Sequence, residues 1–109
     1  MKQKSTSAPK TAFKIPDDDI VYDMSELFKI FGDTTRVKIL CGLFENEMCV
    51  SELTEAVGMT QSAVSHQLRI LRHFRLVLVH RKGRLSYYSI GDNHVKKIFS
   101  MAMEHIREP

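Results

Sequence analysis

The chain has 109 residues, 43% hydrophobic and 27% charged, which is the balance of one globular domain with a modest core. It has no apolar run near the roughly 20 residues that a membrane span requires, and its first residues lack the apolar core of a signal peptide. We therefore expect a cytoplasmic protein with no membrane partner. Two cysteines, Cys41 and Cys49, are too few for a disulfide framework and are expected to be reduced thiols.

Positive charge is concentrated in one part of the chain. The net charge is only +3, but residues 56–91 contain no Asp or Glu. The same stretch carries six basic side chains and three imidazoles: Arg69, Arg72, Arg75, Arg81, Lys82 and Arg84, with His66, His73 and His80. Such a block is typical of a surface that binds a polyanion, although a solvated basic face would have the same composition.

Apolar spacing divides the chain into an arm and one domain. Residues 1–16 carry little apolar content and predict a flexible arm, followed by a domain over residues 17–109. Four helices are predicted first in this domain. They run from about residue 17 to 31, from an Asp33 cap to about residue 44, from a Ser51 cap to about residue 57, and from a Thr60 cap to about residue 74, with Gly32 and Gly58 ending the first and third.

After Arg75 the spacing of the apolar residues is no longer that of a helix. Residues 76–80 and 85–90 are β-branched, apolar or aromatic, and the basic residues between them predict a β-hairpin with a basic tip. Asp92 or Asn93 then caps a last helix. Its apolar side would hold Val95, Ile98, Phe99, Ala102 and Ile106.

Two short capped helices followed by a basic hairpin predict a winged helix-turn-helix, a mainly α fold with a small β-hairpin wing (α+β). Its second helix would lie in a major groove of double-stranded DNA, with the wing beside the backbone. The side chains able to contact bases or phosphates are Thr60, Gln61, Ser62, Ser65, His66 and Arg69 on the helix, and Arg81, Lys82 and Arg84 on the wing. The alternative is a helical hairpin used only for packing.

Four residues near the C-terminus have the side chains of a metal site: Asp92, His94, His105 and Glu108. On one helix, His94 and His105 would share a face within roughly 20° but lie roughly 16 Å apart along the axis. One ion cannot contact both, whereas two antiparallel helices would bring His94 of one chain beside His105 of the other. The pattern predicts a metal site between two chains. The alternative is four polar residues on a solvated helix end. If the terminus frays, water or another group would replace Glu108 as the fourth ligand.

This ordered set of motifs resembles the ArsR/SmtB family of metal-responsive transcriptional repressors over about residues 20–108. The resemblance rests on residues 31–33 with Arg36, on residues 47–53, on residues 61–68 (QSAVSHQL) with Leu71, and on the wing through Tyr87 and Tyr88. It implies a homodimer formed through the N- and C-terminal helices. It also implies that the metal-free dimer binds operator DNA and releases it on binding metal, which derepresses metal efflux or sequestration genes.

The resemblance also distinguishes between effector sites. The family's thiolate site uses a Cys-Val-Cys motif, and here residues 49–51 read Cys-Val-Ser; residues 1–40 offer no Cys or His. The zinc-type site on the last helix is complete, with Asp92 and His94 from one chain and His105 and Glu108 from its partner. Zn(II) is therefore the expected effector, because the set contains no sulfur. Co(II) is a possible substitute, and Ni(II) is less suited because it wants more ligands.

Two other functions are compatible with parts of the sequence. A redox- or ligand-responsive DNA-binding regulator would use Cys41 and Cys49, with the histidines incidental. A zinc enzyme would need an open coordination position and a general base, but here both carboxylates are used as ligands. We therefore expect a regulator and not an enzyme.

Overall fold

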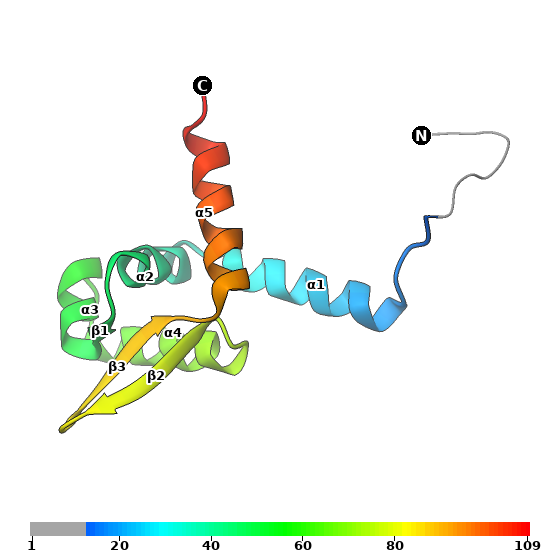
Figure 1. The fold of residues 1–109 in the computed structure, drawn as a ribbon. Coiled ribbons are helices and arrows are strands. Elements are labelled where there is room, and N and C mark those ends of the chain that lie inside the picture. The colour runs from blue at the N-terminus through cyan, green and yellow to red at the C-terminus, as the bar shows by residue number, and fades with distance from the viewer. Residues whose placement is uncertain (1–12) are drawn as a thin grey trace, which may run out of the picture.

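The computed structural model describes residues 13–109, and most of the predicted arm lies outside this range (Figure 1). Five helices and three short strands follow one another in that part of the chain. They are α1 (Asp18–Phe31), α2 (Thr34–Glu45), β1 (Met48–Cys49), α3 (Val50–Val57), α4 (Gln61–His73), β2 (Val77–Lys82), β3 (Leu85–Ile90) and α5 (Asn93–Arg107). Within residues 13–109, no helix has both the length and the apolarity needed to cross a bilayer.

One core joins α2, α3, α4, the sheet and the first turns of α5. Its members are buried apolar residues of these elements and of the loop before β2: Ile39, Leu40, Leu43, Leu53, Val64, Leu68, Leu71, Leu76, Val77, Ile90, Val95 and Phe99. On α4, Val64, Leu68 and Leu71 recur at the spacing of one helical face, so the opposite face is left to solvent. The predicted winged helix-turn-helix is confirmed.

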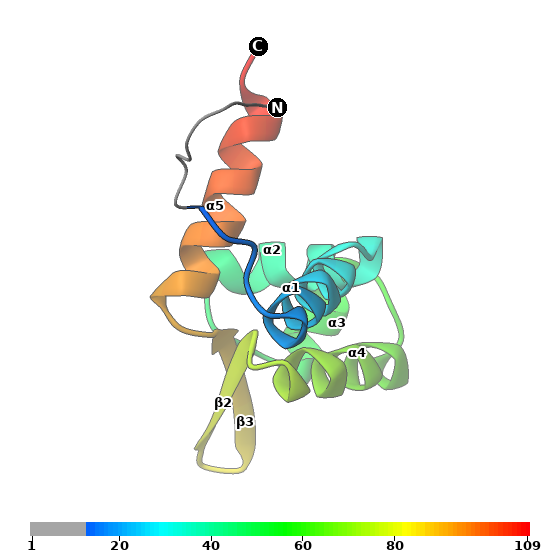
Figure 2. The same ribbon diagram turned by 90° about the vertical axis from the view of Figure 1, so that its right-hand side faces the viewer.

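The first and last helices extend away from this core (Figures 1 and 2). Over Asp18–Phe31 no side chain is fully buried, and α5 buries only Val95 and Phe99. Both helices expose large apolar side chains: Ile20, Val21, Tyr22, Met24 and Phe28 on α1, and Ile98, Met101 and Ile106 on α5. The apolar side predicted for α5 is therefore only partly covered within one chain.

Most helix ends lie where local signals place them. Asp33 Oδ2 accepts from the Arg36 backbone N–H (3.0 Å), and Thr60 Oγ1 accepts from that of Ala63 (3.2 Å). Gly58 ends α3 in the left-handed conformation, with φ +69°.

The predicted Ser51 cap of α3 is wrong. Cys49 precedes the helix, and its backbone N–H donates to Glu52 Oε1 (3.0 Å). The reason is β1, which pairs Met48 with Tyr88 and Cys49 with Tyr87, so the chain leaves the sheet directly into α3.

The wing is longer than predicted and its turn is tighter. β2 and β3 pair from Val77 with Ile90 to Lys82 with Leu85, in a sheet of order β1-β3-β2. Only Gly83 and Arg84 lie between the strands, and Gly83 has φ +63°. Arg81 and Lys82, expected at the tip, therefore belong to β2.

Candidate DNA interface and metal half-sites

The exposed face of α4 carries most of the predicted DNA contacts. Gln61, Ser62, His66 and Arg69 are exposed, whereas Ser65, also among the predicted contacts, is half-buried. The Thr60 hydroxyl caps the helix and lies 3.4 Å from that of Ser62. The free N–H groups of a helix start and nearby hydroxyls are suited to a phosphate, and the side chains one turn later are suited to base edges.

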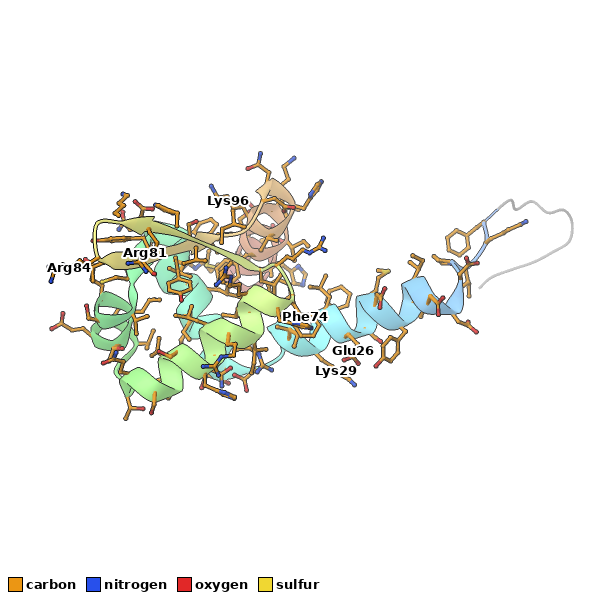
Figure 3. The ribbon with its side chains drawn as sticks, turned by 90° about the horizontal axis from the view of Figure 1, so that it is seen from below. Glu26, Lys29, Phe74, Arg81, Arg84 and Lys96 are labelled. Carbon is orange, nitrogen blue, oxygen red and sulfur yellow. The ribbon has the colours of Figure 1, made fainter. Side chains whose placement is uncertain are left out.

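The strand structure of the wing separates its basic residues. Successive side chains of a strand point to opposite faces, so Arg81 and Lys82 lie on different faces of β2. Arg81 and Arg84 are exposed along the wing, on the side of the molecule away from α1, and an Arg81 Nη2 lies 3.5 Å from the Arg84 carbonyl oxygen (Figure 3). Both guanidinium groups are available to neutralise phosphates.

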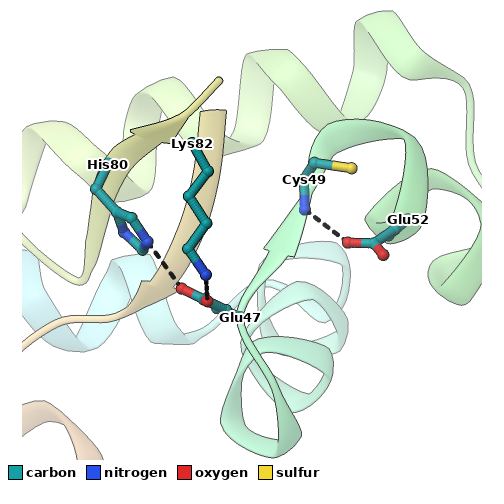
Figure 4. Close-up of polar contacts among 5 residues, drawn as sticks. All are labelled: Glu47, Cys49, Glu52, His80 and Lys82. Atoms are coloured by element: carbon teal, nitrogen blue, oxygen red, sulfur yellow. Dashed lines mark hydrogen bonds and ion pairs between the residues drawn. The ribbon is translucent and has the colours of Figure 1, made fainter. Parts of the chain in front are cut away.

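Lys82 is already paired in the free chain. Its ammonium binds Glu47 Oε2, and His80 Nε2 lies 3.0 Å from Glu47 Oε1, so one carboxylate holds two side chains of the wing (Figure 4). The Lys82 hydrogen bond lowers the pKa of Glu47, and the same bond raises the pKa of Lys82. Sequence reasoning did not identify Glu47, because its partner lies 35 residues further along the chain.

Asp92 and His94 lie together at the start of α5. Asp92 Oδ1 accepts from the Val95 backbone N–H (3.1 Å), and Oδ2 lies 3.4 Å from His94 Nδ1. The hydrogen bond from Val95, followed by that from His94, lowers the pKa of Asp92. The two side chains are 66% and 89% exposed, so a carboxylate oxygen and an imidazole, both of types that zinc accepts, meet at an open surface.

The other two predicted ligands lie at the far end of the same helix. His105 is exposed in the last turn of α5, and Glu108 follows the last helical residue, with its backbone N–H donating to the Glu104 carbonyl (3.1 Å). Within residues 13–109 of one chain, no group of three or more His, Cys, Asp or Glu side chains could hold a metal. Within one chain the four predicted ligands therefore lie in two places, at the two ends of α5.

An apolar groove lies between α1, α2 and α5. Its volume is about 380 Å³, and it is lined by Phe28, Phe31, Val37, Cys41, Ile98, Phe99, Ala102, Met103, Ile106 and Arg107. An apolar hollow that opens to solvent on two projecting helices is typical of a protein interaction surface.

The two thiols are not arranged as a pair. Cys41 is exposed and Cys49 is buried, and both are free. The hydroxyl of Ser51 lies 3.2 Å from Cys49 Sγ, in the place of the missing thiolate. A soft metal at Cys49 would therefore find one thiolate and no second sulfur ligand beside it.

Comparison with known proteins agrees with this geometry. Residues 33–78 match the family described as bacterial regulatory protein, arsR family. The chain is 42% identical over 90 residues to the transcriptional repressor SmtB homolog of Synechocystis, covering 83% of this chain and 68% of that protein. It is 37% identical over 87 residues to the cadmium resistance transcriptional regulatory protein CadC homolog of Staphylococcus aureus, covering 79% and 72%.

A solved structure shares the fold. The homodimeric winged helix-turn-helix DNA-binding domain of Mb0332 from Mycobacterium bovis, a possible ArsR-family regulator, superposes with a TM-score of 0.76 at 24% identity. The match covers 86% of this chain and 90% of that domain.

Proposed function

From its membership of the ArsR family of bacterial regulatory proteins, we propose that the chain is a zinc-responsive repressor. The family consists of DNA-binding transcriptional regulators and not of enzymes. Its metal-free homodimer binds operator DNA, and Zn(II) binding between the two α5 helices releases that DNA. The observation that carries the proposal is the position of the two half-sites, Asp92 with His94 and His105 with Glu108, at opposite ends of one projecting helix.

Dimerisation through α1 and α5 is supported by their exposed apolar side chains and by the groove between them. A second copy of the chain would cover both surfaces at once. In an antiparallel pair of α5 helices, a two-fold axis places each Asp92–His94 half-site beside the partner's other half-site.

Four ligands would then surround each ion. Two imidazoles and two carboxylates form a tetrahedral set that suits Zn(II), with Co(II) a substitute and Ni(II) less suited. The contact between Asp92 Oδ2 and His94 Nδ1 supports this assignment, because their separation of 3.4 Å is close to that of two ligand atoms held tetrahedrally at about 2.0 Å from one ion. Glu108 is the least constrained ligand, since it lies beyond the last helical residue.

Operator binding would use the exposed face of α4 and the wing. The proposed contacts are those of Thr60, Gln61, Ser62, Ser65, His66 and Arg69, together with Arg81, Lys82 and Arg84. A metal that fixes the two α5 helices would change the relative position of the two α4 helices, which must reach successive major grooves roughly 34 Å apart. The coupling is reciprocal, so DNA must weaken zinc binding by the same factor.

The regulated genes are proposed to encode metal efflux or sequestration. The support is a relative whose name places it in cadmium resistance. Since that relative's name concerns a softer metal, the ligand set of this chain, and not the name, carries the choice of zinc.

The test combines metal stoichiometry with operator affinity. A duplex selected by the protein from random sequences is titrated with protein, with and without Zn(II). We expect two zinc ions per dimer, weaker DNA binding with zinc, and loss of both effects in His94→Ala. Glu104→Ala, which removes an exposed carboxylate of α5 outside the proposed set, should change neither. An operator affinity that zinc leaves unchanged would refute the proposed regulation.

A further inference from the structure

The guanidinium group of one α2 residue contacts two other helices. Arg36 lies in the first turn of α2, where its backbone N–H is bound by Asp33. Its Nε donates to the Ile30 carbonyl in the last turn of α1 (2.9 Å), and its Nη1 donates to Gln67 Oε1 on α4 (3.2 Å). These contacts join segments 6 and 31 residues away along the chain.

The contact with Ile30 fixes the end of α1. The last four carbonyls of a helix have no partner within it, and a cation there also interacts favourably with the helix dipole. The bond to Ile30 is important because α1 packs against the core through its C-terminal end, where Leu27, Ile30 and Phe31 are half-buried (Figure 1). Arg36 adds a directed polar contact to that small apolar attachment.

The contact with Gln67 fixes the recognition helix. Gln67 is half-buried on α4, between His66, which faces solvent, and Leu68, which is in the core. A planar guanidinium holds its donors in a rigid fork, so its two bonds constrain both position and angle. The orientation of α4 is thereby set relative to α1, a helix that lies outside the core.

We propose that Arg36 is a positioning residue for operator binding, which fixes the angle between the recognition helix α4 and the dimer-forming helix α1 without contacting DNA itself. This inference rests on the proposed dimer, in which the spacing of the two α4 helices depends on how each is held to its own α1. A loose α4 costs affinity because the two helices must match half-sites at a fixed separation.

The test is a double-mutant cycle on the full chain with the selected duplex. Arg36→Met and Gln67→Met should each weaken operator binding about tenfold, the effect of one charged hydrogen bond. The double variant should be no weaker than Arg36→Met, because that variant already lacks the bond to Gln67. Gln67→Met is the more informative single change, because it leaves the contact between Arg36 and Ile30 intact.

Two further readouts separate positioning from charge. The slope of log affinity against log salt should be unchanged in Arg36→Met, whereas loss of a phosphate contact would lower it by about 0.9. Arg36→Lys keeps the charge but loses the fork, and it should bind as weakly as Arg36→Met. Additive losses in the cycle, a reduced salt slope, or full affinity in Arg36→Lys would each overturn the inference. If the wild-type chain selected no duplex, the proposed function itself would fail.

Discussion

Asp92 Oδ1 accepts a hydrogen bond from the backbone N–H of Val95 (3.1 Å), so a predicted metal ligand is also the N-cap of α5. The two roles use different oxygens, because Oδ2 is the one near His94 Nδ1. The helix start is thus already fixed in the metal-free chain, with one carboxylate oxygen left for an ion. Preorganisation of this kind lowers the ordering cost of binding.

Asp92→Asn should separate the cap from the ligand. Asparagine is as good an N-cap as aspartate, but its neutral amide is a poor zinc ligand. We expect near wild-type operator binding without metal and a loss of zinc affinity of about 100-fold or more, measured by competition with a chelator. Asp92→Ala, which loses both roles, should lower the thermal midpoint of the metal-free protein further than Asp92→Asn does. Equal zinc affinity in Asp92→Asn would remove Asp92 from the ligand set.

The pH dependence of the thermal midpoint should reveal the stabilising effect of the ionised Asp92 carboxylate. The pKa of Asp92 is below its ordinary value, so its charge stabilises the fold above that ordinary value, and this is lost as the pH falls through the lower, folded-state pKa. The metal-free wild type should therefore melt above Asp92→Asn at pH 7, and the difference should shrink only below about pH 4. Thermal melts at a series of pH values measure this. A difference that disappears near pH 6 would point to another group.

Glu47→Gln should strengthen operator binding. The variant releases Lys82 and His80 from their shared carboxylate, so the wing gains a free cation for a phosphate. Because exposed ion pairs are weak, we expect roughly threefold tighter binding. We also expect a steeper salt dependence, by about 0.9 in log–log slope. Glu45→Gln is the matched control: it changes the net charge equally, and Glu45 forms no ion pair among residues 13–109. Equal effects in the two variants would mean that only net charge matters.

Local signals predicted most of the fold. The caps at Asp33 and Thr60 and the stop at Gly58 depend only on neighbouring residues, and all three are where the sequence predicts them. The two-residue strand β1 could not be predicted, because it exists only through pairing with Tyr87 and Tyr88. The error at Ser51 follows from that omission.

For the candidate sites too, the sequence predicted what depends on neighbouring residues and not the contacts between distant segments. The residue types and spacing on α5 predicted two half-sites at its ends, and the structure brings Asp92 and His94 together. Whether the halves of two chains meet stays a prediction. The pairing of Glu47 with Lys82 and that of Arg36 with Gln67 join distant parts of the chain, and no local pattern signals them.

Ile106→Lys should disrupt the dimer. Ile106 is 80% exposed at the edge of the apolar groove, and a buried ammonium at an interface would be strongly unfavourable. We expect the dimer dissociation constant to rise by about tenfold or more in analytical ultracentrifugation, with zinc binding lost in parallel. Leu78→Lys makes the same change at a 54% exposed position on the wing and should leave the dimer intact. A stable dimer in Ile106→Lys would place the interface elsewhere.

Gly91→Ala should destabilise the joint between the wing and α5. A Cβ there would lie 2.7 Å from the Arg75 carbonyl oxygen and 3.3 Å from that of Leu76, which accepts from the Gly91 N–H at 2.9 Å. Because these atoms are backbone, relief requires moving the chain, at a cost of about 1–3 kcal/mol. Gly42→Ala is the opposite case: its Cβ would contact only flexible side-chain atoms, with Leu53 Cδ2 nearest at 3.5 Å. Replacing a mid-helix glycine there should stabilise by about 0.5–1 kcal/mol. Denaturant unfolding gives the free energy of unfolding of both variants. Destabilisation of equal size in both would contradict the steric argument.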